Sequence, residues 1–211
     1  MSDEHGWKPL SPPEVASIFA RAEFPWWIAG GYAIDHAIGY PLRSHVDIDV
    51  LVLRTDQLRV QQRLCGWDCW ASDPPGTLRP WYEGEVLSPP ASDIWCRKEQ
   101  GGPWQLQLML DESREGWWYS RRHPLVTKPI RKLSALAENQ IPYLAVQVQL
   151  FYKAKRPRLI DEIDFAATLP LLKRSQLAWL ASAILTAYGP DNAWLSKIIE
   201  RLSVMGASTQ L

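Results

Sequence analysis

The stretch from residue 26 to residue 53, WWIAGGYAIDHAIGYPLRSHVDIDVLVL, constrains the fold of this chain more than any other. Its first four residues are an apolar run that meets Gly30 and Gly31. Residues 32–38 then have the amphipathic spacing of a helix, which a glycine and a proline end. Residues 47–53 read as an apolar strand that begins with alternating acids. We therefore predict a strand, a helix and a second strand, with the glycine pair at the first junction.

The glycine pair at this junction is suited to binding an anion. Without side chains, the backbone of Gly30 and Gly31 can approach a phosphate group closely. The first N–H groups of the following helix have no acceptor within the helix, and the helix dipole favours negative charge there. We predict that the phosphates of a ligand lie at this turn.

Two acids begin the second strand of the stretch. Asp47 and Asp49 are two residues apart, so on a strand their side chains share a face, with backbones about 7 Å apart. Two carboxylates so close repel each other unless a cation lies between them. Mg²⁺ is commonly bound by one or two carboxylates together with substrate phosphates. The pair therefore predicts a magnesium site close to the phosphate site.

The glycine pair, the helix and the Asp-hydrophobic-Asp-hydrophobic strand, in this order, resemble the nucleotidyltransferases of the DNA polymerase beta type. WWIAGGYAIDHAIG followed by RSHVDIDV is similar to the small aminoglycoside and lincosamide nucleotidyltransferases of antibiotic resistance. IPYLAVQVQLFYKAKRPRLIDEIDF, at residues 141–165, looks like their C-terminal part. The resemblance implies an α+β fold, with a nucleotidyltransferase-type mixed sheet flanked by helices and followed by a C-terminal helical bundle.

The resemblance also implies a reaction. A nucleoside monophosphate, AMP from ATP or the equivalent from another nucleoside triphosphate, would be moved onto a hydroxyl group of a small molecule with the help of Mg²⁺. Arg43 and His45 would contact the nucleotide, and Lys153 or Lys155, of which we favour Lys153, would reach the triphosphate. His45 could instead only position its loop, and Lys153 could simply complement the dipole at a helix end. Arg121 and Arg122 could clamp phosphate or merely solvate a loop.

The resemblance further implies a third carboxylate on a strand beside the two acids, to complete the metal site or to accept the proton of the attacking hydroxyl. We assign this role to Asp111, which ends a predicted strand on its polar face. Gln107 stands where the acid would have been expected. Asp93, Glu85 and Glu112 are the rival candidates, and Asp111 could equally be a turn residue.

Composition limits the other functions open to the chain. Its 211 residues contain 23 acidic and 23 basic side chains, whereas proteins that bind nucleic acid through bulk charge usually have a basic excess. No apolar run reaches the roughly 20 residues needed to span a bilayer, and the first residues lack the form of a signal peptide. Three cysteines without CxxC spacing indicate reduced thiols. We therefore expect a cytoplasmic monomer or homodimer with no membrane partner and no nucleic-acid partner.

The sequence changes character near Pro129 and is helical from Leu133 onward, which divides the chain into a catalytic domain, 1–130, and a helical bundle, 131–211. Before the division, a helix is expected from residue 12 to 23, a helix from 56 to 65 and strands at 67–71, 93–98 and 104–110. After it, helices are expected at 134–138, 143–155, 161–168, 175–188 and 192–202.

The sequence says less about the acceptor molecule than about the nucleotide and the metal. Residues 73–90 read as a long loop whose Trp81 and Tyr82 favour a substrate lid, and Glu83 and Trp117 are further candidates for contact with the acceptor. A cationic aminoglycoside would be favoured by carboxylates, which Glu83, Glu85, Asp111 and Glu112 could supply. A different class of function stays open, in which the chain is a toxin-antitoxin-type partner that binds nucleotide or modifies another protein.

Overall fold

The structure is a computed structural model that describes residues 6–207. The helices are α1 (Pro12–Ile18), α2 (Gly30–Ile38), α3 (Gln57–Arg63), α4 (Val146–Lys153), α5 (Leu159–Thr168), α6 (Arg174–Tyr188) and α7 (Ala193–Ala207), with short 3-10 turns at Arg54–Asp56, Ile130–Lys132 and Leu169–Leu171. The strands are β1 (Trp26–Ile28), β2 (Asp49–Leu53), β3 (Asp68–Ser72), β4 (Leu78–Pro80), β5 (Asp93–Arg97), β6 (Leu106–Arg114), β7 (Trp117–Ser120), β8 (His123–Pro129), β9 (Ser134–Leu136) and β10 (Pro142–Leu144).

The strands form one mixed sheet in the order β4-β3-β5-β6-β2-β1-β10-β9. Parallel pairs, β2 with β6 and β1 with β10, lie at its centre, and the remaining neighbours are antiparallel. The end of β6 extends beyond the main sheet and pairs with the β7–β8 hairpin. The mixed sheet flanked by helices that the sequence predicted is confirmed.

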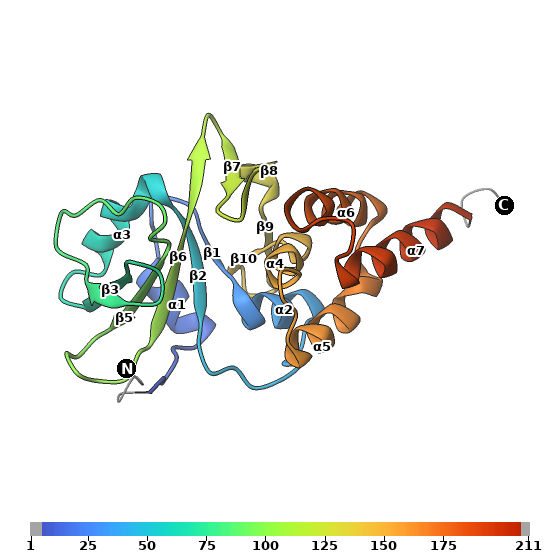
Figure 1. Ribbon diagram of the computed structural model, residues 1–211. Helices are drawn as coiled ribbons and strands as arrows, with labels where there is room; N and C mark the ends of the chain where they lie inside the picture. Colours follow the sequence, from blue (N-terminus) through green and yellow to red (C-terminus); the bar gives the residue numbers. More distant parts are fainter. Residues whose placement is uncertain (1–5, 208–211) are drawn as a thin grey trace.

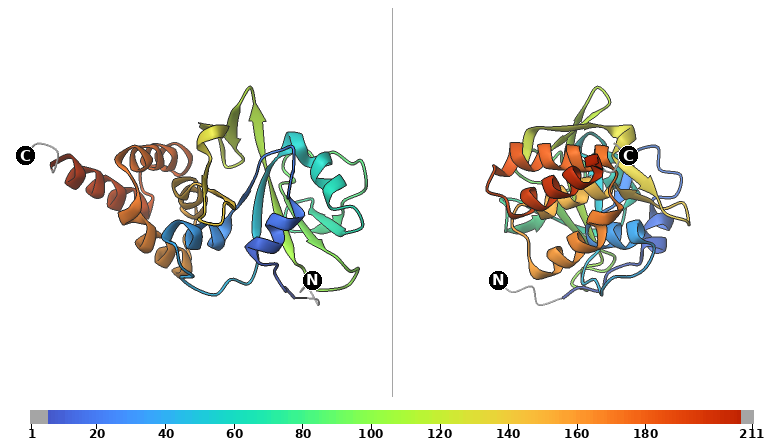
Figure 2. Two further views of the ribbon diagram at one scale, coloured as in Figure 1. Left: turned by 180° about the vertical axis from the view of Figure 1, so that it is seen from behind. Right: turned by 90° about the vertical axis from the view of Figure 1, so that its right-hand side faces the viewer.

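Hydrophobic cores cover both faces of the sheet. Val50 and Val52 of β2 belong to the core beneath α1 and α3, whereas Leu51 and Leu53 belong to the core beneath α2 and α4–α7. Figures 1 and 2 show the C-terminal helices together on one side of the sheet, with α1 and α3 on the other. Because β2 is buried on both faces, its sequence is an uninterrupted apolar run after Asp49.

Local signals identified several element ends correctly. The backbone N–H of Ser11 donates to Glu14 at 2.7 Å, which is half of the capping box predicted before α1, and Asn192 accepts the N–H of Trp194 at 3.0 Å at the start of α7. The first helix is shorter than predicted, ending at Ile18. Gly39 ends α2 in the left-handed conformation, at φ 84°.

The helix predicted at residues 134–138 and the start of the helix predicted at 143 are wrong. Residues 134–136 and 142–144 are instead β9 and β10, and Tyr143 lies beside Ile28 of β1 in parallel register. A free sheet edge at β1 offers this segment backbone partners, and tertiary pairing overrides its helical spacing. The division of the chain at residue 130 stays a prediction, although β9 and β10 join the sheet of the first part.

None of the helices among residues 6–207 combines the length and the apolar character that crossing a membrane requires. The first residues, on which the expectation about a signal peptide rests, lie outside the described range.

Candidate nucleotide and metal site

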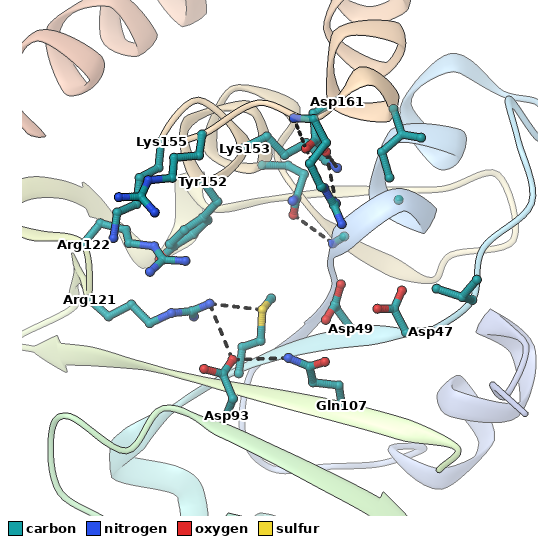
Figure 3. Close-up of a pocket in the computed structure, with 18 of the residues that line it drawn as sticks. Asp47, Asp49, Asp93, Gln107, Arg121, Arg122, Tyr152, Lys153, Lys155 and Asp161 are labelled. Atoms are coloured by element: carbon teal, nitrogen blue, oxygen red, sulfur yellow. Dashed lines mark hydrogen bonds and ion pairs between the residues drawn. The ribbon is translucent and has the colours of Figure 1, made fainter. Parts of the chain in front are cut away.

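A cavity of about 370 Å³ lies where the start of β2 faces the end of α4 and the connection to α5. Its acidic lining residues are Asp47, Asp49, Asp93 and Asp161, and its basic ones are Arg43, Arg121, Arg122, Lys153, Lys155, Arg156 and Arg158. Figure 3 shows Asp47 and Asp49 projecting side by side, with Arg121, Arg122 and Lys155 on another wall. The cavity therefore has an acidic floor opposite basic walls.

Backbone hydrogen bonds fix the position of the acidic pair. The N–H of Ala29 donates to the carbonyl of Asp49 at 2.8 Å, and the N–H of Gln107 donates to the carbonyl of Ile48 at 2.9 Å. Burial first, and then the charges of Asp47 and Asp93, raise the pKa of Asp49 to about 7, against the opposing effect of Arg121 and Lys153. The pair thus lies in one cavity at an electrostatic cost that a cation would relieve.

Gly30 lies directly against the side chain of Asp49, and Gly31 lies against the side chain of His45. A Cβ on Gly30 would be 2.1 Å from the carboxylate of Asp49, and one on Gly31 would be 2.2 Å from the imidazole of His45. Gly30 also has a φ of +62°, in the left-handed region. Its N–H, which we expected to face phosphate, donates to the buried side chain of Gln149 at 2.9 Å. One donor of the predicted phosphate site is therefore already occupied by the protein.

A prediction follows for Gly30→Ala, which would force Asp49 to move. Nucleotide transfer, or metal binding measured by titration, should fall by at least about tenfold, because misplacing a reacting group by about 1 Å costs up to 10²-fold. Gly66→Ala is the matched control, since Gly66 also has a positive φ, +83°, but no atom within 4 Å of its missing Cβ. Equal activity losses in the two variants would show that backbone strain, not the contact with Asp49, is responsible.

Arg43, His45 and Lys153 belong to a network of ion pairs behind the cavity. Arg43 forms a bidentate salt bridge with the buried Asp164, with the Nε–Oδ1 and Nη2–Oδ2 distances both 3.0 Å. Lys153 lies 2.7 Å from Asp161 and 2.9 Å from Asp164. Burial opposes the ionisation of Asp164, but bonds from Arg43 and Lys153 lower its pKa overall. Arg43 and Lys153 still line the cavity, so a phosphate would meet cations whose positions are already set.

His45 lies behind Gly31 and is not among the cavity-lining residues. Its Nε2 is 2.6 Å from a carboxylate oxygen of Asp35, and its Nδ1 is 3.1 Å from Arg43. Tyr32 covers its ring, with centroids 4.3 Å apart. These contacts favour the positioning role that the sequence left open, in which His45 supports the loop before Asp47.

Asp111 is buried away from the cavity. Its carboxylate accepts hydrogen bonds from Trp118 Nε1 at 2.6 Å, from Arg121 at 3.1 Å and from the hydroxyl of Tyr152. Three donors therefore occupy an acid that has no exposed surface. Arg121, which it holds, lines the cavity and packs over the ring of Tyr152 at 4.8 Å. The geometry makes Asp111 a support for Arg121 instead of the third acid of the metal site.

Asp93, a rival candidate from the sequence, does line the cavity, together with Asp47, Asp49 and Asp161. Its Oδ1 accepts a bond from Gln107 at 3.3 Å and is 3.9 Å from Arg121. Glu85 and Glu112 are bound to arginines outside the cavity, Glu85 to Arg79 and Glu112 to Arg54.

The residues predicted to contact the acceptor do not line the cavity. Trp81 is buried in the core beneath α1 and α3, and its indole N–H donates to the carbonyl of Glu85 at 2.9 Å. The predicted lid packs on α3 instead. The side-chain amide of Gln61 donates a hydrogen bond to the carbonyl of Tyr82 and accepts one from the N–H of Gly84. Tyr82 and Glu83 are exposed on this loop. Trp117, 45% exposed, lies on β7 and not in a loop.

The basic wall is only partly foreseen from the sequence. The run KAKRPR, residues 153–158, follows α4, and four of its side chains line the cavity: Lys153, Lys155, Arg156 and Arg158. The sequence singled out the lysines, whereas the density of positive charge in this run was the signal for the arginines. Arg121 and Arg122 enter from the β7–β8 turn and both line the cavity, which favours a ligand-binding role for them over the solvated loop.

The residues present suit a magnesium ion that is shared with phosphate. Among residues 6–207, no group of three His, Cys, Asp or Glu side chains is arranged to hold a metal unaided. Two adjacent carboxylates are, however, a suitable partial donor set for an ion completed by substrate phosphates, which the basic wall would bind. Asp47 and Asp49 would supply the protein ligands.

Comparison with known proteins agrees with the predicted resemblance. A family model described as aminoglycoside-2''-adenylyltransferase matches residues 13–71. A comparison with curated protein sequences gives no match.

Three similar solved structures share the fold of this chain at sequence identities below 20%. The lincosamide antibiotic adenylyltransferase LnuA, lincomycin-bound, is 17% identical with a TM-score of 0.52, covering 77% of this chain and 97% of its own. ANT(2'')-Ia in complex with adenylyl-2''-tobramycin is 13% identical with a TM-score of 0.50, and the match covers 81% of this chain and 93% of that one. A solution structure of ANT(2'')-Ia is 12% identical with a TM-score of 0.51, and the match covers 94% of this chain and 94% of that one. The chain therefore shares the fold of these structures, and its residues 13–71 match the family model, in agreement with the resemblance drawn from the sequence.

Proposed function

We propose that this protein transfers a nucleoside monophosphate, AMP from ATP or the equivalent from another nucleoside triphosphate, to a hydroxyl group of an aminoglycoside- or lincosamide-like antibiotic. The observation that carries the proposal is one cavity that Asp47 and Asp49 line together with Arg43, Arg121 and Lys153. This combination matches a nucleotide whose charge is shared between a divalent ion and cationic side chains.

Asp47 and Asp49 would hold Mg²⁺, which supplies charge stabilisation at the phosphates when bound. Lys153 and Arg43, fixed by Asp161 and Asp164, would contact the triphosphate from the wall beside Gly31. Such preset cations need no reorganisation as charge develops during the reaction.

Asp93 would accept the proton of the acceptor hydroxyl. It lies in the same cavity as the acidic pair, and Gln107 and Ser92 donate to its two oxygens at 3.3 and 2.9 Å. The hydroxyl oxygen would then bond to the α-phosphorus as the bond to the leaving pyrophosphate breaks. A cytoplasmic location, where ATP is available, is part of the same proposal.

Labelled ATP, Mg²⁺ and a panel of aminoglycosides and lincosamides test the function directly. We expect label on a small molecule and release of pyrophosphate, both abolished by EDTA. Label found only on protein, or none in any mixture, would overturn the small-molecule reaction.

Asp93→Asn should reduce turnover more than it reduces nucleotide binding, because its role begins after the nucleotide has bound.

A further inference from the structure

The charge of the cavity narrows the class of acceptor, and this inference rests on the proposed function. Each acid that lines the cavity already has a role or a partner. Asp47 and Asp49 belong to the metal pair, Asp93 lies 3.9 Å from Arg121, and Asp161 pairs with Lys153 at 2.7 Å and Arg158 at 2.9 Å. Among the described cavity-lining residues, no carboxylate is left for an ammonium group of a substrate.

Carboxylates that the sequence suggested for a cationic acceptor lie elsewhere. Glu85 is bonded to Arg79, and Glu112 to Arg54. Asp111 is fully buried, and Glu83 is on a loop that packs against α3. None of these acids lines the cavity, so a polycation would gain no ion pair from them.

Positive charge, in contrast, is in excess. Seven basic side chains line the cavity against four acidic ones, and two buried acids behind the wall, Asp164 and Asp111, reduce the formal excess from three to one. Arg122, Lys155 and Arg156 remain exposed at the rim, and none of them forms an ion pair with an acid of the described chain.

These rim cations lie outside the part of the chain that matches the aminoglycoside family model. The match ends at residue 71 and contains the glycine pair and Asp47 and Asp49, whereas all the rim cations follow it. The family match therefore concerns the nucleotide side of the cavity and leaves the charge of the acceptor side to be determined from the structure.

From these observations we infer that the acceptor is a hydroxyl compound without clustered positive charges, neutral or anionic at the groups nearest the rim. Arg122, Lys155 and Arg156 would disfavour polycations, since like charges placed opposite each other suppress wrong partners. Within the proposed function, this inference favours a lincosamide-like acceptor over an aminoglycoside.

Calorimetric titration of the full chain with tobramycin, used as a polycationic probe, tests the inference without requiring catalysis. The protein is first loaded with Mg²⁺ and a non-hydrolysable ATP analogue at low ionic strength, and the titration is repeated without the analogue. In the triple variant Arg122→Glu, Lys155→Glu and Arg156→Glu, we expect tobramycin to bind at least about tenfold more tightly than in the native protein. A control with the same charge change on exposed residues outside the cavity, Lys8→Glu, Arg131→Glu and Lys132→Glu, should bind tobramycin as the native protein does.

Equal gains in the two triple variants, or native protein that binds tobramycin as tightly as the rim variant, would overturn the inference. Where transfer is detected, kcat/KM for lincomycin should exceed that for tobramycin by at least about tenfold, and the reverse order would also overturn it. Failure of the ATP analogue to bind would instead count against the proposed function, and the titration without the analogue still decides the question of charge.

Discussion

Asp49→Asn is expected to reduce nucleotide transfer by at least about 10³-fold, which corresponds to about 4 kcal/mol of lost transition-state stabilisation. Asp49 begins β2 and faces the cavity beside Asp47, so its replacement removes one of the two carboxylates available to a metal. Turnover measured with saturating ATP and Mg²⁺ checks the result. Undiminished turnover would refute the metal role of the pair.

The same variant should fold at least as well as the native protein, and this separates the loss of activity from a loss of structure. The folded-state pKa of Asp49 is raised from 3.8 to about 7 by burial and by Asp47. Between these values the folded protein keeps a proton that the unfolded chain releases, so this group lowers stability as the pH rises. In EDTA, Asp49→Asn should therefore be the more stable protein near pH 8, and the difference should shrink toward pH 4. Denaturant unfolding at both pH values measures it, and a less stable variant at pH 8 would contradict the assignment.

Asp111→Ala is expected to destabilise the fold by about 3–5 kcal/mol, because it removes one partner from a buried ion pair. Arg121 would lose its 3.1 Å contact, and the indole N–H of Trp118 and the hydroxyl of Tyr152 would lose their shared acceptor. Burial disfavours charge on Arg121, yet Asp111, Tyr152 and Asp93 keep its pKa above the usual value. Without Asp111 this balance is lost.

Glu112→Ala provides the matched control for this measurement. Glu112 is the next residue on β6 and also pairs with an arginine, Arg54, but its side chain is 44% exposed. Arg54 keeps two backbone acceptors, the carbonyls of Leu87 and Ala91. We expect a loss of about 1 kcal/mol or less, as for other exposed pairs. Equal losses in the two variants, from denaturant midpoints at constant m value, would contradict the supporting role of Asp111.

The acidic pair and its strand were predictable because the signal is local. Alternation over two residues predicts the shared face of Asp47 and Asp49, and the apolar run predicts the strand, although β2 itself begins only at Asp49 and Asp47 precedes it. The third acid was not predictable in the same way, because it depends on which strands are neighbours and in what register. Asp49 lies beside Gln107, so Asp111 is four residues, about 13 Å, further along the sheet. Asp93 reaches the cavity because β5 runs antiparallel to β6, and this register places Asp93 beside Met109, which also lines the cavity.

The helices after residue 145 were also predictable, since caps and apolar spacing are properties of short segments. The local sequence around Asp161 and Asp164 is typical of caps and surface charges, and it could not convey that both side chains are buried. Only the folded chain brings Arg43, 121 residues away, into contact with Asp164. Ion pairs across such distances have no periodic trace in a sequence.

The pairing of β10 with β1 has a consequence for engineering this protein. A fragment cut at residue 130 would present the edge of β1 as an open template, and edges of this kind promote aggregation. It would also leave the guanidinium of Arg43 without Asp164. Grafting the C-terminal half of a relative to change specificity should therefore begin upstream of β9, so that donor and recipient share a complete set of strands.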